Sequence, residues 1–181
     1  MSNVVRINDD VFYIDSFLSK EECESYIEMT EHKGYEEALI ISGGKAISAP
    51  EIRNNKRVII DSEEIAEIWW KRAVGVLPGS IDGNKITGFN ERFRFYRYTP
   101  NQQFLIHKDY PYERNGQKSK LSFIVYLNED FEGGNTDFRA FEVEPVTGRA
   151  LVFRHELLHE GKVVVSGTKY AVRTDVMYET M

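Results

Sequence analysis

Two residues near the middle of the chain, His107 and Asp109, have the types and the spacing of a metal site. Alternate side chains of an extended strand point to the same face, so these two would lie side by side with Lys108 turned away. His159, from a distant strand, would complete the two-histidine, one-carboxylate triad that binds non-haem Fe(II) and leaves coordination positions open. Open positions are typical of a catalytic metal. The pattern therefore favours an oxygen-activating enzyme.

The histidine and aspartate pattern is short, so other interpretations stand beside it. The chain has four histidines, and His155 competes with His159 for the third ligand position. A lone histidine is more often a core or surface residue, which is our interpretation of His32. The same ligands could hold Zn(II) for hydrolysis, or the site could belong to a non-catalytic metal-binding sensor.

Five ordered blocks make the chain resemble the 2-oxoglutarate and Fe(II)-dependent dioxygenases, specifically their prolyl 4-hydroxylase-like branch. The resemblance covers about residues 92–178 and rests on 97–109 (RYTPNQQFLIHKD), 121–128 (LSFIVYLN), 131–136 (FEGGNT), 158–161 (LHEG) and 167–170 (GTKY). It implies that His107, Asp109 and His159 bind iron. It also implies a basic residue ten positions after the second histidine, where Lys169 stands. The same offset measured from His155 matches nothing in the family, which favours His159.

The resemblance implies Fe(II), 2-oxoglutarate and O2 as the reactants that accompany the substrate, with L-ascorbate as an auxiliary. Lys169 would pair with the distal carboxylate of 2-oxoglutarate, because a cation at the closed end of a pocket fixes one end of a dicarboxylate. Tyr98 and Tyr126 match positions that line the cosubstrate pocket. The alternative interpretations are an exposed lysine beside a turn and two ordinary core tyrosines.

The implied reaction is hydroxylation of an unactivated C–H bond, with release of succinate and CO2. The family branch favours a prolyl residue in a peptide or protein. A free amino acid or another small molecule remains the alternative substrate. A hydrolase needs no dicarboxylate anchor, so Lys169 argues against the zinc interpretation.

Two arginines are further candidates for contact with the substrate. On a regular strand Arg173 shares a face with Lys169 and Asp175, and Arg94 shares a face with Tyr98. A buried arginine needs a partner, so Arg173 either pairs with a carboxylate such as Asp175 or reaches the substrate. An ion-paired or solvated strand charge is the simpler interpretation of Arg94.

The sequence patterns of the elements that must position these residues predict a mainly β domain with flanking helices. Ser19 and Glu22 form a capping-box pattern that predicts a helix ending near Gly34. The sequence 61–64 (DSEE) repeats the signal less strongly and predicts a second helix that ends near Gly75 or Pro78. From residue 87 onward, short strands separated by turn residues predict a double-stranded β-helix, or jelly roll. They are expected at 88–99, 103–109, 119–127, 135–138, 140–144, 149–154, 160–165 and 169–178.

We expect the 181 residues to form one domain, with 1–86 as a helical support region and 87–181 as the catalytic core. Loops 41–57 and 110–119 are candidates for a lid over the substrate. The single cysteine and the polar first ten residues favour a cytoplasmic location, and no apolar run is long enough to span a membrane. The net charge of -6 argues against nonspecific binding of nucleic acid.

Overall fold

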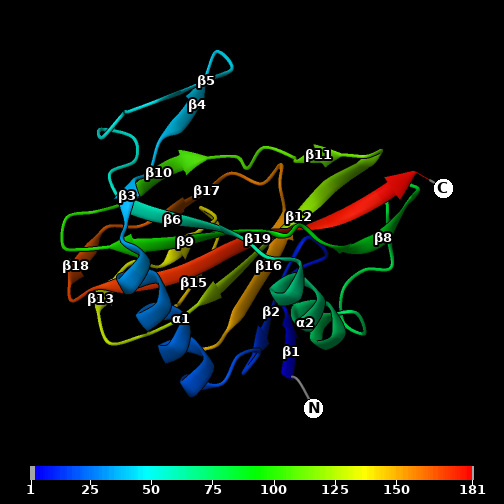
Figure 1. Cartoon of the computed structure of the whole chain (residues 1–181), viewed down its shortest axis with the longest axis horizontal. Coiled ribbons are helices and arrows are strands. Elements are labelled where there is room, and N and C mark those ends of the chain that lie inside the picture. The colour runs from blue at the N-terminus through cyan, green and yellow to red at the C-terminus, as the bar shows by residue number, and fades with distance from the viewer. Residues whose placement is uncertain (1–2, 181) are drawn as a thin grey trace.

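The computed structural model describes residues 3–180, and most of its strands belong to one large antiparallel sheet (Figure 1). Eight strands form its main path, in the order β1 (Asn3–Arg6), β2 (Val11–Asp15), β16 (Ala150–Arg154), β12 (Gln117–Tyr126), β19 (Lys169–Thr180), β9 (Arg92–Tyr98), β6 (Lys56–Asp61) and β3 (Glu36–Glu37). Three others attach beside this path: β8 (Asn84–Phe89) pairs with β19, β7 (Ser80–Ile81) with β8, and β11 (Glu113–Arg114) with β12.

A smaller sheet faces the large one. Its strands, all antiparallel, are in the order β10 (Phe104–His107), β17 (His159–Gly161), β14 (Thr136–Asp137) and β15 (Glu142–Val143). One cavity is lined by β9, β12 and β19 of the large sheet and by β10, β14 and β17 of the small sheet. Two sheets that enclose a cavity between them agree with the predicted jelly-roll class. Two further strand pairs are β13 (Glu132–Gly133) with β18 (Val164–Ser166) and β4 (Ile40–Ser42) with β5 (Lys45–Ile47).

Both helices expected from the sequence are confirmed. Helix α1 (Lys20–Lys33) begins after Ser19, whose Oγ accepts a hydrogen bond from the amide of Glu22 while the Glu22 carboxylate accepts one from the amide of Ser19. It ends at Gly34, which has a φ of 86°. Helix α2 (Glu63–Ala73) begins after Ser62, whose Oγ accepts from a first-turn amide. The caps thus work as the sequence indicates.

Apolar side chains fill the space between the helices and the large sheet. Trp69 of α2 is fully buried, and its ring meets Phe17, Phe93 and Phe123 edge-on or tilted at centroid distances of 5.3, 5.1 and 5.8 Å. Strand alternation sends neighbouring residues of the same strands to the opposite face, so Tyr98 of β9 lines the cavity between the sheets. Trp69 of α2 therefore packs on one face of the sheet, and the opposite face lines the cavity.

Residues 1–86, expected as a helical support region, contain strands as well as the two helices, and the division of the chain at residue 86 stays a prediction. Strand β2 pairs with β16, and β6 pairs with β9, so this region supplies strands to the large sheet itself. The segment Val11–Asp15 consists mostly of β-branched and aromatic residues, which favour a strand. Its pairing covers an edge of β16 that would otherwise expose unpaired backbone groups.

Most of the expected strands are shorter than predicted, and those expected at 135–138 and 140–144 are reduced to the short strands β14 and β15. The strand expected at 88–99 is interrupted after Phe89, because the amide of Asn90 bonds to the carbonyl of Asp175. The strand expected at 160–165 divides into β17 and β18, and the amide of Lys162 between them bonds to Asn135. The strand expected at 103–109 ends at His107. Within residues 3–180, no helix is long and apolar enough to cross a membrane.

Candidate active site

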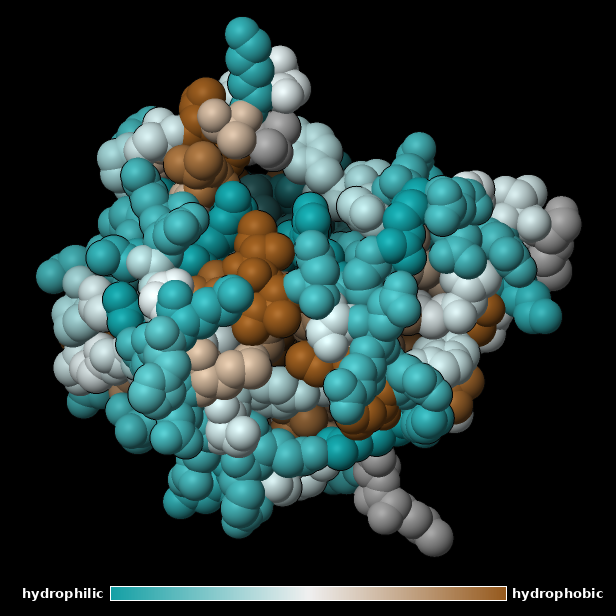
Figure 2. Space-filling model, viewed as in Figure 1, coloured by the Kyte–Doolittle hydropathy of each residue, from teal (hydrophilic) through white to brown (hydrophobic). Residues whose placement is uncertain are grey.

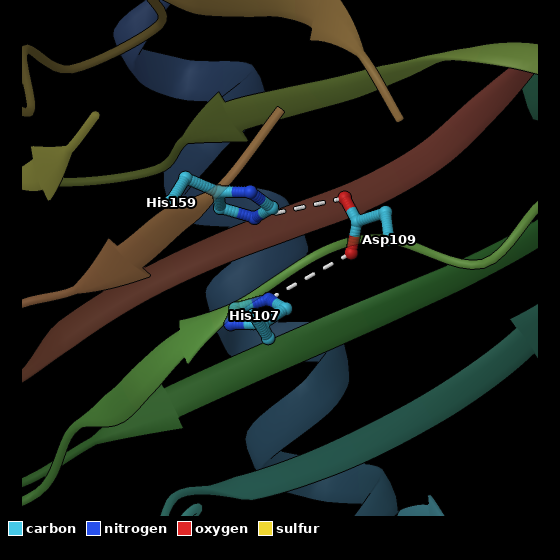
Figure 3. Close-up of side chains that lie close together, drawn as sticks. All are labelled: His107, Asp109 and His159. Carbon is cyan, nitrogen blue, oxygen red and sulfur yellow. Dashed lines mark ion pairs between the residues drawn. The ribbon is translucent and has the colours of Figure 1, made fainter. Parts of the chain in front are cut away.

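The side chains of His107, Asp109 and His159 converge in the cavity between the sheets (Figure 3). His107 ends β10 and is the direct partner of His159, which begins β17, in the antiparallel pairing of the two strands. Asp109 lies two residues beyond β10, and its amide donates to the carbonyl of His155 at 3.1 Å. One ligand atom from each of the three residues lies within 4.8 Å of the others. The three side chains can therefore reach a common metal ion.

Both imidazoles are held with Nε2 toward the carboxylate. Nδ1 of His107 lies 2.7 Å from the carbonyl oxygen of Leu105, and Nδ1 of His159 lies 3.0 Å from that of Leu157. The two Nε2 atoms lie 3.8 and 3.7 Å from the oxygens of Asp109. Burial lowers the pKa of His107 to about 4 and lowers that of His159, so both rings are neutral near pH 7. Donation from Nδ1 leaves the Nε2 lone pair for a metal.

Asp109 is ionised although it is buried. Desolvation opposes its charge, but the Arg173 guanidinium and the two imidazoles outweigh this effect and hold the pKa of Asp109 well below its usual range. Arg173 Nη1 donates to Oδ1 at 2.6 Å, and Ser122 Oγ donates to Oδ2 at 2.5 Å. Ser122 is not among the residues that the sequence pattern marks as site residues. Its signal is a hydroxyl in an apolar strand, on the same face as Tyr126.

The two arginines proposed as substrate contacts lie in one buried ionic network behind the carboxylate ligand. Arg173 Nη2 donates to Asp175 Oδ1 at 2.8 Å, and Arg94 Nη1 donates to Asp175 Oδ2 at 3.1 Å. Asp175 has no exposed surface. Burial lowers the pKa of Arg173, but Asp109 and Asp175 outweigh burial and raise it. Both arginines also line the outer cleft described below, and their contact with substrate stays a prediction.

His155 lies behind Asp109 with both ring nitrogens engaged. Its Nε2 is 2.7 Å from Ser119 Oγ, and its Nδ1 is 2.9 Å from Ser122 Oγ. A ring in this position helps to hold the serine that bonds Asp109. The geometry therefore favours His159 over His155 as the third ligand.

Lys169 lies at the other end of the same cavity, with an exposed fraction of 4%. Its Nζ donates to the carbonyl of Gly134 at 2.5 Å and lies 5.3 and 5.5 Å from the ring centroids of Tyr98 and Tyr126. The Tyr126 hydroxyl is 2.7 Å from Thr136 Oγ1. Burial alone lowers the pKa of Lys169 to about 7, and no carboxylate of residues 3–180 forms an ion pair with it. The pocket thus holds a buried cation that lacks an anion.

These residues fit the groups that the sequence implies. Two neutral imidazoles and one ionised carboxylate are the donor set of a non-haem Fe(II) site with open positions. The uncompensated ammonium of Lys169, in the same cavity, fits the distal carboxylate of 2-oxoglutarate. Nothing in a hydrolytic zinc site would require such a cation.

A wider cleft of about 840 Å³ opens in front of the triad and is lined by its ligands His107 and Asp109. Five residues between 39 and 57 line one part of this cleft, and residues 107–111 and 118–120 line another. The β4–β5 pair projects beside it (Figure 1). Figure 2 shows the surface hollowed beside the projecting pair. Both segments proposed as a lid therefore border the metal-ligand triad, although their closure stays a prediction.

Comparison with known proteins gives a family match over the part of the chain that carries this site. A model of the 2OG-Fe(II) oxygenase superfamily matches residues 93–174, a range that contains all three metal-ligand candidates and Lys169. No curated protein gives a significant sequence match.

Solved structures with the same fold include several prolyl hydroxylases. A viral collagen prolyl hydroxylase from Paramecium bursaria Chlorella virus-1, in complex with 2OG, is 24% identical with a TM-score of 0.69, covering 96% of this chain and 98% of that one. A Trichoplax adhaerens prolyl hydroxylase with a hypoxia-inducible-factor peptide is 18% identical (TM-score 0.71; 93% and 84%). A Pseudomonas putida prolyl-4-hydroxylase is 17% identical (TM-score 0.68; 95% and 93%). The chain is thus similar to the 2OG-Fe(II) oxygenase superfamily over the residues that carry the site, and the match together with the candidate metal-ligand triad supports a 2-oxoglutarate-dependent dioxygenase.

Proposed function

We propose that this dioxygenase hydroxylates a prolyl residue in a peptide or protein. The observation that carries the proposal is the continuity of the site: a small cavity of about 50 Å³ joins Lys169 to the metal-ligand triad, and a much larger cleft of about 840 Å³ is lined by His107 and Asp109 of the same triad. The small cavity suits a small dicarboxylate and the larger cleft suits a peptide chain. Two neighbours in fold are a collagen prolyl hydroxylase and a prolyl hydroxylase with a peptide.

Each residue of the site has a defined task in this proposal. His107, Asp109 and His159 hold Fe(II), which when bound supplies the activation of O2 that insertion into a C–H bond requires. Lys169 binds the distal carboxylate of 2-oxoglutarate. Arg173 orients the Asp109 carboxylate through its hydrogen bond to Oδ1. The proposed reaction consumes O2, 2-oxoglutarate and the prolyl C–H and yields hydroxyprolyl, succinate and CO2.

In this proposal two tyrosines shield the cosubstrate and an auxiliary reductant maintains the iron. Tyr98 and Tyr126 form the walls of the cavity around Lys169 and keep water away from the cosubstrate. L-Ascorbate would return oxidised iron to Fe(II) between turnovers.

The test is hydroxylation of a defined peptide. The enzyme is incubated with Fe(II), 2-oxoglutarate, ascorbate and a blocked peptide that contains one proline, and succinate is measured together with the peptide mass. We expect succinate and a peptide heavier by one oxygen atom, and neither product when alanine replaces proline. Free L-proline is the second substrate to be tested. Turnover of free proline with none of the peptide would reject the peptide substrate.

A further inference from the structure

The cleft in front of the metal-ligand triad has a charge opposite to that of the whole chain. The sequence has 29 acidic and 23 basic residues, a net charge of -6. The cleft is instead lined by eight basic residues and three acidic ones: Arg53, Arg57, Arg94, Lys108, Lys118, Lys120, Arg154 and Arg173 against Asp82, Asp109 and Glu156. A concave surface with one sign of charge raises the local concentration of the opposite ion.

Most of these cations already have a carboxylate partner. The ion pairs are Arg94 with Asp175, Arg173 with Asp109 and Asp175, Arg154 and Lys120 with Asp82, and Lys118 with Glu113. Within residues 3–180, this leaves Arg53, Arg57 and Lys108 without an ion-pair partner. Lys108 is exposed, whereas Arg53 is buried. The two arginines therefore carry the charge that a ligand could use.

Arg53 is held beside the metal-ligand triad with part of its guanidinium unused. Its exposed fraction is 6%, its Nε donates to Asn55 Oδ1 at 2.8 Å, and its Nη2 is buried with no hydrogen-bond partner in the described chain. The guanidinium carbon lies 4.4 Å from the ring centroid of Phe104 and 4.9 Å from that of Tyr96. Phe104 in turn stacks on His107 at 3.5 Å. A single aromatic ring therefore separates Arg53 from a metal-ligand candidate.

Arg57 adds a second cation to the same wall. Its register partner is Tyr96 of β9, so the two side chains lie on one face of the sheet. Burial, together with the nearby charges of Arg53 and Arg94, lowers the pKa of Arg57. Glu36, the register partner of Arg57 on β3, opposes this shift, but it forms no ion pair with Arg57. Two neighbouring guanidiniums that repel each other and have no ion-paired carboxylate are stabilised when an anion binds between them.

The backbone around Arg53 is fixed before any ligand binds. The Arg53 amide donates to the carbonyl of Ala49 and the Leu105 amide to the carbonyl of Ile52, both at 2.9 Å. The first bond closes a turn within the arginine segment, and the second ties this segment to β10, the strand that carries His107. Donors that are already in place lose little conformational freedom on binding.

We propose that Arg53 and Arg57 form an anion subsite that binds an acidic side chain of the peptide substrate, close in sequence to the hydroxylated proline. The inference rests on the proposed prolyl hydroxylation and names the class of peptide that the cleft takes. An extended peptide advances about 3.3 Å per residue. Because one aromatic ring separates Arg53 from the triad, the acidic residue of the peptide should lie within about two positions of the hydroxylated proline.

The test compares three blocked peptides that differ only in the two residues flanking a single proline, which are Glu, Gln or Lys. Binding is measured by fluorescence anisotropy under anaerobic conditions with Fe(II) and 2-oxoglutarate, and succinate formation is measured separately in air. The variants are Arg57→Glu and the milder Arg57→Gln. Lys85→Glu is the matched control, because it makes the same charge change at an exposed position of β8 outside the cleft. Circular dichroism confirms that each variant is folded.

We expect the wild-type protein to bind the Glu peptide at least about tenfold more tightly than the Lys peptide, the value of one charge-assisted contact. Arg57→Gln should remove most of this preference and Arg57→Glu should reverse it, whereas Lys85→Glu should keep it. Equal binding of all three peptides to the wild-type protein, or a preference that survives Arg57→Glu, would overturn the subsite.

The two readouts separate this inference from the proposed function. Glu-dependent binding that requires Arg57, without hydroxylation, would support the subsite and reject the prolyl substrate. Hydroxylation of all three peptides with equal kcat/KM would support the prolyl substrate and reject the subsite. Arg57-dependent turnover of free L-proline with no peptide binding would assign the carboxylate to a small substrate and overturn the peptide form of the inference.

Discussion

Asp109 is the only charged member of the metal-ligand triad, and it receives hydrogen bonds from Arg173 and Ser122. Asp109→Ala should abolish turnover, because it removes the anionic ligand and leaves Arg173 with Asp175 alone. Consumption of 2-oxoglutarate, and the visible charge-transfer band of the Fe(II) and 2-oxoglutarate complex, are the measurements. Glu113→Ala removes an exposed carboxylate that pairs only with Lys118 and should change neither. Normal 2-oxoglutarate consumption by the Asp109 variant would reject the site.

Lys169 has a different task at the other end of the cavity. Its ammonium lies between two tyrosine rings without a carboxylate partner, so 2-oxoglutarate is the anion that completes its surroundings. Lys169→Met keeps the apolar length and removes the charge. We expect KM for 2-oxoglutarate to rise about 10- to 100-fold, the range of a lost hydrogen bond to a charged group. An unchanged KM for 2-oxoglutarate would remove Lys169 from the pocket.

At the scale of elements, the segment before β6 and the strand β10 act as a unit. Asn54 joins them. Its side-chain Oδ1 accepts a hydrogen bond from the backbone amide of Gln103 at 2.8 Å, and its backbone amide donates one to the Gln103 carbonyl. Asn54→Ala should cost about 1 kcal/mol of unfolding free energy and raise KM for the peptide, because Arg53 loses its anchor to the ligand strand. KM for 2-oxoglutarate should stay as it was, because Lys169 lies on β19.

A matched asparagine tests whether this effect is local. Asn8 bonds the Asp10 and Val11 amides in the turn between β1 and β2, which lies outside the cleft. Asn8→Ala should reduce stability by a similar amount and leave both KM values unchanged. A rise in the peptide KM of both variants would mean that reduced stability, and not the position of Arg53, causes it.

The sequence predicts elements where a local signal dictates them. The serine cap of α1, the existence of α2 and the alternation of β9 and β19 follow from short-range chemistry, and the structure agrees with them. The end of β10 before Asp109 could not be predicted, because a hydrogen bond from Asp109 to the distant His155 directs the chain there. The roles of Ser122 and Arg53 likewise depend on neighbours that only the fold brings close.

At the scale of the whole molecule, buried basic side chains with lowered pKa values make the free energy of unfolding depend on pH. Burial lowers the pKa of His107 and His155 to about 4, so unfolding takes up protons between pH 4 and the ordinary value of 6.5. Stability therefore rises with pH across this range. Lys169 adds a second range, because its pKa is lowered to about 7 from the ordinary 10.5. Above pH 7 the folded protein has released this proton while the unfolded chain still holds it.

Because the unfolded state binds more protons, the unfolding free energy of the ligand-free protein should rise again from pH 7 to 10, by up to about 1.4 kcal/mol per pH unit. Chemical unfolding at fixed temperature across this range measures the slope. Lys169→Met should be more stable than the wild type at pH 7 and should lose the second rise, while the rise between pH 4 and 6.5 remains. Saturating 2-oxoglutarate should flatten the second rise in the wild type alone, because the bound carboxylate keeps Lys169 charged. A wild-type profile that matches that of Lys169→Met above pH 7 would show that Lys169 is already charge-compensated, and would remove the physical reason for placing 2-oxoglutarate beside it.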